Sequence, residues 1–270
     1  MDKFQQVKLL NQMLISEMPE IEKQAAQVPE DLISQRQLLR ALMNIRPPMP
    51  LKSSFLKLQD ELLQLEAQEK GIVTIEEISS QFLIPNSSFL IKIWQGDITR
   101  LEVDAIVNAA NSALLGCFAP LHNCIDNAIH SAGGLQLRDA CNKIMESQGH
   151  EEPTGQAKIT PAFNLPSKFV IHTVGPIIPP DRLPNSTEEE LLASCYQSCL
   201  ELAVENNLKS IAFCCISTGE FHFPNRRAAE IAIETIKNFL KDNNSDIIII
   251  FNTFKDIDTE IYKSLLKSSS

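Results

Sequence analysis

Residues 210–241, SIAFCCISTGEFHFPNRRAAEIAIETIKNFLK, decide the fold class. An apolar run from Ser210 to Cys215 predicts a strand, a loop with a single glycine follows, and apolar residues at helical spacing begin after Asn225. The same order of strand and helix recurs from about residue 85 onward. Strands that alternate with helices favour a mostly parallel sheet covered on both faces. We therefore predict an α/β fold with its functional residues in the loops at the carboxyl ends of the strands.

The remaining strands and helices follow from the same two patterns. Strands are predicted over Ser88–Trp94, Ala105–Asn108, Ala157–Pro161, Phe169–Val174, Ser210–Cys215 and Asp246–Asn252. Helices are predicted over Asn123–Ser131, Leu135–Ser147, Glu188–Asn206, Asn225–Lys241 and Asp258–Leu266. Thr187 precedes three glutamates and is typical of a helix start, because acidic side chains favour the positive end of the helix dipole.

The N-terminal part of the chain has a different composition. No glycine precedes Gly71, and leucines recur at helical spacing between breaks at Pro19, Pro29 and Pro47–Pro50. We predict a helical extension of about three helices over residues 1–84 and an α/β domain over residues 85–270. The simplest interpretation is that the extension packs on the α/β domain and stabilises it. The alternative is that it recruits a partner protein.

Composition excludes several function classes. The chain has 270 residues and a net charge of −10, which argues against a broad surface for nucleic acid. The longest aliphatic run, at residues 247–251, is far shorter than the about 20 residues that span a bilayer. The polar N-terminus has no secretory signal, so we expect a cytoplasmic protein without a nucleic-acid or membrane partner.

Residues 116–130, GCFAPLHNCIDNAIH, contain three candidate metal ligands within eight residues. Cys117, His122 and Cys124 match a zinc site with three protein ligands and one open position. The alternative is two buried cysteines and a loop histidine, and the residues alone leave both open, because Cys-x4-His-x-Cys is not a standard structural-zinc spacing. Asp126 and His130 lie on one face of the predicted helix, either as supporting partners of the site or with His130 in the core.

Three further loops carry polar residues. Asp97, after the first predicted strand, could accept a hydrogen bond from an adenine amino group or cap the next turn. Asn108 and Asn111 could bind a sugar or form a turn. The loop from Ser217 to Pro224 presents backbone amides beside a helix N-terminus, which suits a pyrophosphate. The other five cysteines are predicted to be core residues without chemistry: Cys141, Cys195, Cys199, Cys214 and Cys215.

Together these loops resemble the macrodomain family. The motifs GDIT, NAAN, CIDNAIHSAGG, GQAKIT, VIHTVGP and STGEFHFP follow in this order between Gln95 and Pro224. Common catalytic macrodomains have a run of glycines where this chain has GCFAPLHNC, and that replacement resembles the zinc-dependent macrodomains of bacteria and fungi, which also carry a helical N-terminal extension. The resemblance implies a three-layer α/β/α fold that binds ADP-ribose in a crevice at the carboxyl edge of the sheet. It also implies an enzyme that removes mono-ADP-ribose from modified proteins.

The resemblance further implies a role for each matching residue. One Zn²⁺ per chain would be held by Cys117, His122 and Cys124. Asn111 and Asp126 are the implied catalytic residues, the first orienting the distal ribose and the second positioning the attacking water or accepting its proton. ADP-ribose contacts are expected from Asp97, Ile98, Asn111, Cys124, Ile125, Asp126, Ser217, Thr218, Gly219, Glu220 and Phe221, with Phe254 beside the adenine.

Two consequences of the resemblance stay open. Zinc-dependent members are often paired with a sirtuin-like ADP-ribosyltransferase that acts on a lipoyl-carrier protein, so the resemblance suggests such a carrier as the mono-ADP-ribosylated protein substrate. The alternative function is a non-catalytic reader module that binds ADP-ribose and contains a structural zinc. Four protein ligands to the metal would indicate the reader, and three would indicate the enzyme.

Overall fold

The computed structural model describes residues 1–79, 81–83, 90–243 and 245–267. Its centre is a seven-stranded sheet in the order β2-β3-β9-β8-β5-β7-β6. The strands are β2 (Gln81–Leu83), β3 (Leu90–Gln95), β5 (Ala105–Ala110), β6 (Ala157–Pro161), β7 (Phe169–Val174), β8 (Ser210–Phe213) and β9 (Ile248–Thr253). Neighbouring strands from β3 to β7 are parallel, and the edge strands β2 and β6 are antiparallel to their neighbours.

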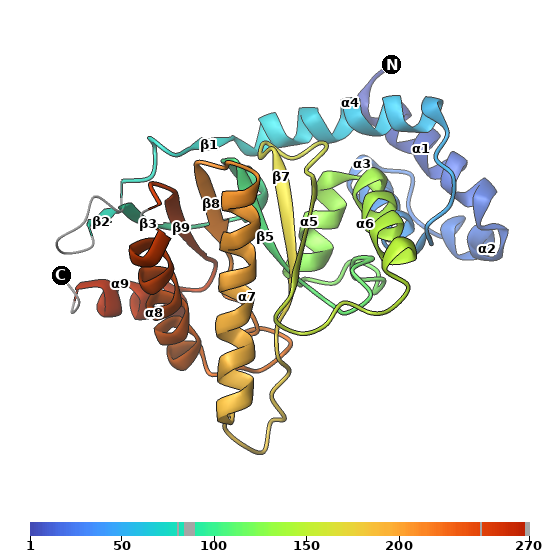
Figure 1. Ribbon diagram of the computed structural model, residues 1–270. Coiled ribbons are helices and arrows are strands. Elements are labelled where there is room, and N and C mark those ends of the chain that lie inside the picture. The colour runs from blue at the N-terminus through green and yellow to red at the C-terminus, as the bar shows by residue number, and fades with distance from the viewer. Residues whose placement is uncertain (80, 84–89, 244, 268–270) are drawn as a thin grey trace.

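Helices cover both faces of this sheet (Figure 1). α5 (Ile125–Gly133) and α6 (Leu135–Gln148) lie on one side, and α7 (Ser186–Glu205), α8 (Asn225–Asn243) and α9 (Asp256–Lys267) lie on the other. The central strands are buried on both faces, as their continuous aliphatic sequence requires; Ile106, Ile211 and Ile249 are fully buried. The predicted α/β fold with a mixed, mostly parallel sheet is confirmed.

The register of the parallel strands brings their carboxyl ends to one edge. Gln95 at the end of β3 pairs with Thr253 of β9, and Ala110 at the end of β5 pairs with Val174 of β7. The loops that follow these strands therefore leave the sheet on the same side, where ligands bind in open α/β sheets. The first of them opens with η2 (Ile98–Arg100).

The N-terminal extension consists of α1 (Lys3–Glu17), η1 (Pro19–Ile21), α2 (Glu22–Ala25), α3 (Leu32–Ile45) and α4 (Ser53–Lys70). Residues 19–25 thus form two short helical turns beyond the three long helices predicted. Leu10, Leu39 and Leu62 form a small core of the extension, to which Leu135 of α6 also belongs. The extension therefore packs against the α5–α6 side of the sheet (Figure 1).

Most predicted elements are present, with ends shifted by a few residues. The predicted start of α7 at Thr187 is wrong, because Asn185 caps the helix and forms a reciprocal capping box with Glu188. The predicted strand start at Ser88 lies outside the described residues.

Three short strands were not predicted. β1 (Val73–Thr74) pairs with β4 (Leu101–Glu102), and β2 pairs with β3, although β1 and β2 lie in the range predicted as extension. The predicted boundary between residues 84 and 85 stays a prediction. In the described part of the chain, we find no helix of the length and apolarity that a membrane crossing requires.

Candidate active site

The three predicted metal ligands lie together in the loop between β5 and α5. The ligand atoms of Cys117, His122 and Cys124 are all within 4.8 Å of one another, and each side chain is partly accessible. Cys124 is the N-cap of α5, and its Sγ accepts a hydrogen bond from the backbone N–H of Asn127 at 3.4 Å. Among the described residues this cluster has three members, and the carboxylate of Glu220 lies 4.0 Å from His122 Nε2.

The donor set fits a zinc ion. Atoms bound to one tetrahedral zinc at about 2.0–2.3 Å lie roughly 3.3–3.8 Å apart, so the observed cluster needs only small adjustments. Burial raises the pKa of the Cys124 thiol, and the neighbouring Cys117 raises it further, against the Asn127 amide. The Cys124 thiol would therefore release its proton when a cation binds. Three protein ligands would leave one coordination position for another group.

Asp126 and Asn111, the two predicted catalytic residues, are in contact. Asn111 Nδ2 donates to Asp126 Oδ2 at 3.2 Å, and Asn108 Nδ2 donates to Asp126 Oδ1 at 2.8 Å. Asn111 also holds the loop, because its Nδ2 donates to the Gly116 carbonyl at 3.2 Å. Asp126 is only 4% exposed, and burial raises its pKa to about 6, although Asn108 and the charge of Arg138 lower it. The site thus contains an oriented carboxyl group that titrates near neutral pH.

A second, fully buried group of His130, Cys141 and His172 lies behind Asp126. His172 Nε2 is 2.9 Å from Thr160 Oγ1, and His172 Nδ1 is 3.1 Å from Asn108 Nδ2. Burial lowers the pKa of His172 to about 3 and raises that of Cys141 to about 12, so both side chains are neutral. His130 Nε2 lies 3.5 Å from Asp126 Oδ1, which makes it a buried neighbour of the site. His172 of this group contacts Asn108, and Asn108 in turn orients Asp126.

The predicted anion loop follows β8 and leads into α8. Ser217 has a positive φ of 64°, and its carbonyl accepts from the Phe223 amide at 2.9 Å. Gly175 lies directly against it, since a Cβ there would be 2.0 Å from Ser217 Oγ. Within the described residues, the amides of Gly219, Glu220 and Phe221 donate no hydrogen bond to the protein. These amides are free to bind an anion beside the N-terminus of α8.

Asp97 has the capping role considered for it, and its contact with adenine stays a prediction. Its Oδ1 caps η2 by accepting from the Thr99 amide at 3.0 Å, and its Oδ2 lies 3.6 Å from Lys70 Nζ at the end of α4. Ile98, predicted near the adenine, is buried in the main core. Phe254 is 75% exposed after β9 and is accessible to a ligand.

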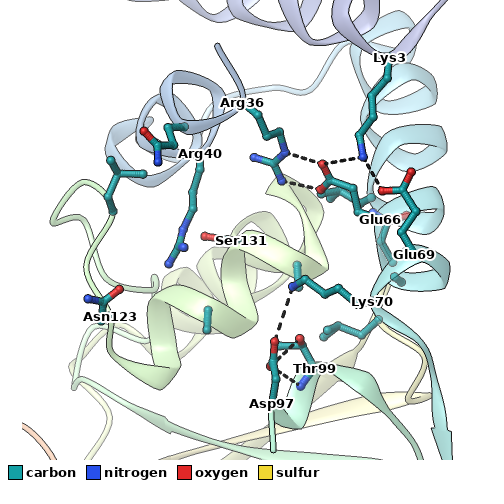
Figure 2. A pocket seen from close by; sticks show the side chains of 18 residues that line it. Lys3, Arg36, Arg40, Glu66, Glu69, Lys70, Asp97, Thr99, Asn123 and Ser131 are labelled. Carbon is teal, nitrogen blue, oxygen red and sulfur yellow. Dashed lines mark hydrogen bonds and ion pairs between the residues drawn. The ribbon is translucent and has the colours of Figure 1, made fainter. Parts of the chain in front are cut away.

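A cavity of about 670 Å³ separates the extension from α5 and η2 (Figure 2). Of the predicted ADP-ribose residues, only Asp97 lines it. The loop over residues 111–124, between β5 and α5, is called the metal loop for its predicted ligands, and it contributes Leu121 and Asn123. Figure 2 shows the ion pairs of Lys3, Arg36 and Lys70 with carboxylates in this cavity. Its wall is therefore largely charge-compensated.

The structure adds residues to the site that the sequence did not indicate. These residues, all polar and in contact with the metal loop, are Arg40, Asn44, Asn127 and Arg138. Arg40 and Asn44 come from the extension, where their helical pattern carries no sign of a contact with a distant loop. The predicted partners of the loop were confined to the helix that follows it.

Comparisons with known proteins agree with this geometry. Residues 107–232 match the family model described as Macro domain. A protein of Treponema medium named protein-ADP-ribose hydrolase is 51% identical over 240 residues, which cover 89% of this chain and 90% of that protein.

Two solved structures share the fold. The Oceanobacillus iheyensis macrodomain with ADP has a TM-score of 0.61 and 42% identity, covering 70% of this chain and 94% of its own. The Trypanosoma brucei macrodomain in complex with ADP-ribose has a TM-score of 0.64 and 27% identity, covering 84% of this chain and 94% of its own. The chain therefore belongs to the macrodomain family, and its relatives include proteins named protein-ADP-ribose hydrolase.

Proposed function

We propose that this protein is a zinc-dependent hydrolase that removes mono-ADP-ribose from modified proteins. The observation that carries the zinc dependence is the cluster of Cys117, His122 and Cys124, which adjoins the buried Asp126. The hydrolase activity is supported by the Treponema relative, and the ligand by the macrodomain solved with ADP-ribose.

The loop after β8 anchors the substrate. Free backbone amides at residues 219–221 would bind the diphosphate, and Asp97 would accept a hydrogen bond from the adenine amino group. These two anchors fix the distal ribose near the loop between β5 and α5. Because the distal ribose is held beside the catalytic residues, the attack of water takes place within one complex and loses less entropy.

Asp126 and Asn111 act on the reacting end. The Asp126 carboxylate would orient the attacking water and accept its proton, and the Asn108 and Asn111 amides hold it in place. The water oxygen adds to the anomeric carbon of the distal ribose, or to the carbonyl carbon of an ester linkage. The bond between ADP-ribose and the protein side chain breaks, the protonated Asp126 returns its proton to the departing atom, and ADP-ribose leaves. A zinc ion held by Cys117, His122 and Cys124 supplies Lewis acidity beside this bond when it is bound.

The test compares release of ADP-ribose from a modified protein by the parent and by Cys117→Ala and His122→Ala. We expect both variants to lose turnover and to retain most of their affinity for free ADP-ribose. Cys199→Ala is the matched control, because this buried thiol lies in α7 outside the cluster. A metal-free Cys117→Ala protein that releases ADP-ribose at the parent rate would disprove the zinc dependence.

A reader module with a structural zinc is the alternative. The observation that supports this alternative is the position of Glu220. Its carboxylate lies 4.0 Å from His122 Nε2 and could supply a fourth zinc ligand. Glu220→Gln separates the two functions: an enzyme with three protein ligands retains its zinc affinity and its turnover, whereas a reader with Glu220 as a fourth ligand has no turnover and binds zinc more weakly in the variant. We also propose an ADP-ribosylated lipoyl-carrier protein as substrate and the cytoplasm as the place of action.

A further inference from the structure

The metal loop rests on polar side chains of α3, a helix of the extension. Arg40 donates from Nη2 to the carbonyl of His122 at 3.1 Å and to Asn127 Oδ1 at 2.8 Å. Its Nε also donates to Asn127 Oδ1, at 3.2 Å. In Figure 2 the Arg40 side chain extends from α3 toward α5 and is separate from the paired Arg36. One guanidinium group thus contacts the backbone of a predicted metal ligand and the first turn of α5.

Asn44, one turn further along α3, holds the same loop at a second point. Its Oδ1 accepts a hydrogen bond from the backbone N–H of Leu121 at 3.0 Å, and its Nδ2 donates to Ser131 Oγ at 3.1 Å. Ser131 Oγ in turn donates to Asn127 Oδ1 at 3.2 Å. Asn44 is buried, so the loss of these bonds could not be replaced freely by water.

Asn127 connects both contacts to the ligands. It is fully buried, and its Nδ2 donates to the carbonyls of Ala119 at 3.0 Å and Cys117 at 3.4 Å. Its backbone N–H donates to Cys124 Sγ. Because Arg40 and Ser131 donate to Oδ1, the amide can turn only one way, with Nδ2 facing the loop. The orientation of Asn127 is therefore fixed from the extension.

We infer that Arg40 and Asn44 are positioning residues of the metal site. Through them, the extension holds the loop that carries the three predicted ligands. The inference rests on the proposed zinc binding by Cys117, His122 and Cys124. Arg40 and Asn44 fix the backbone on either side of His122, and outer partners of this kind orient metal ligands before the metal arrives. Without these two side chains, the metal loop would become ordered only when zinc binds. The entropy lost in ordering the loop would then weaken zinc affinity.

The extension has other contacts with the α/β domain that do not involve Arg40 or Asn44. Gln59 accepts from the backbone N–H of Leu135 at 2.9 Å, and Arg138 donates to the carbonyls of Met43 and Arg46. These contacts and the shared apolar core keep the extension docked when Arg40 or Asn44 is changed. A variant at these positions can therefore test the loop separately from docking.

The experiment measures zinc affinity of the full chain by competition with a chromophoric chelator. Arg40→Gln is expected to bind zinc about 10–100-fold more weakly than the parent, as for other outer partners of metal ligands. Arg36→Gln is the matched control, because Arg36 lies one turn earlier on α3 and pairs with Glu66 of α4. We expect its zinc affinity to stay within about threefold of the parent, as for most surface substitutions.

Two further measurements keep the outcome decisive. Arg40→Gln should stay folded without zinc, with only a small fall in melting temperature, because the other contacts of the extension remain. Its affinity for free ADP-ribose should fall much less than its zinc affinity, because the main proposed anchors, the amides at residues 219–221 and Asp97, lie outside the loop between β5 and α5. Arg40→Lys keeps the charge but not the forked contact, so it should recover zinc affinity only in part. Asn44→Ser serves as an independent variant at the second contact, with the same expected direction.

Unchanged zinc affinity in both Arg40→Gln and Asn44→Ser would overturn the inference, as would full recovery in Arg40→Lys. A fall in zinc affinity that accompanies an equal loss of ADP-ribose binding and of zinc-free stability would also overturn it, since that indicates general disruption. Failure of the proposed function looks different, because the parent itself would then bind no zinc or hydrolyse without it.

Discussion

Asp126→Asn tests whether the buried carboxyl group that is proposed to act in catalysis lowers the free energy of unfolding when it is ionised. The substitution keeps the size of the side chain and removes the charge that forms above the raised pKa. In the folded chain, Asp126 is almost inaccessible and its pKa is about 6, against an ordinary value of 3.8. The folded state therefore holds the proton more tightly than the unfolded state. The free energy of unfolding must fall as pH rises from about 4 to about 6.

The size of this effect follows from the two pKa values. At 1.36 kcal/mol for each pKa unit, the ionised group lowers stability by about 3 kcal/mol at neutral pH. About 2–3 kcal/mol of this difference appears between pH 4 and pH 7, because the unfolded carboxyl group is already partly ionised at pH 4. The substitution also lowers the free energy of unfolding of the variant by a constant amount, because the new amide N–H would face the amide donors of Asn108 or Asn111. This amount does not change with pH.

Urea unfolding of the zinc-free parent and of Asp126→Asn at pH 4, 5, 6 and 7 measures the effect. Comparison of the two proteins removes the pH dependence that all other groups contribute equally. We expect the stability of the variant relative to the parent to rise by about 2–3 kcal/mol from pH 4 to pH 7, together with loss of turnover. A relative stability that stays constant over this range would refute the raised pKa of Asp126.

Three further substitutions test other parts of the site. Gly175→Ala places a Cβ 2.0 Å from Ser217 Oγ and 3.3 Å from Ser217 Cβ, so the Ser217 side chain at the start of the anion loop must shift, and calorimetry should show weaker ADP-ribose affinity; unchanged affinity would show that the close approach of Gly175 to Ser217 does not matter for the ligand. Arg138→Met removes one hydrogen bond to the carbonyl of Leu115 and two to carbonyls of the extension, and should lower the free energy of unfolding in urea by about 3 kcal/mol or more, whereas a loss below about 1 kcal/mol would mean that these bonds add little to the stability of the fold. Asp97→Ala should weaken ADP-ribose binding by about tenfold and leave zinc affinity unchanged, and equal ADP-ribose binding would restrict Asp97 to its capping role.

Local patterns were sufficient to predict most of the α/β part. Continuous aliphatic runs such as residues 247–251 predict strands that are buried on both faces, and β9 occupies this position. The strand β2 was not predicted, because three residues at a sheet edge have no distinguishing periodicity. The start of α7 was misplaced by two residues, since Asn185 and Thr187 are both good caps and only the reciprocal bond with Glu188 separates them.

The candidate site was predicted as far as it depends on neighbouring residues in the chain. Cys117, His122 and Cys124 lie in one loop, and the pairing of Asn111 with Asp126 joins the ends of that loop. The contributions of Arg40 and Asn44 could not be predicted, because they depend on how a separate group of helices docks on α5. Tertiary contacts of this kind leave no local signal in a helical sequence.

Turnover as a function of zinc occupancy tests the central claim most directly. Metal-free protein would be loaded with increasing zinc, and the metal content per chain and the release of ADP-ribose from a modified protein would be measured on the same samples. The account predicts that activity rises in proportion to zinc and reaches its maximum at about one ion per chain. Full activity in samples without metal, or zinc binding that leaves the rate unchanged, would contradict it.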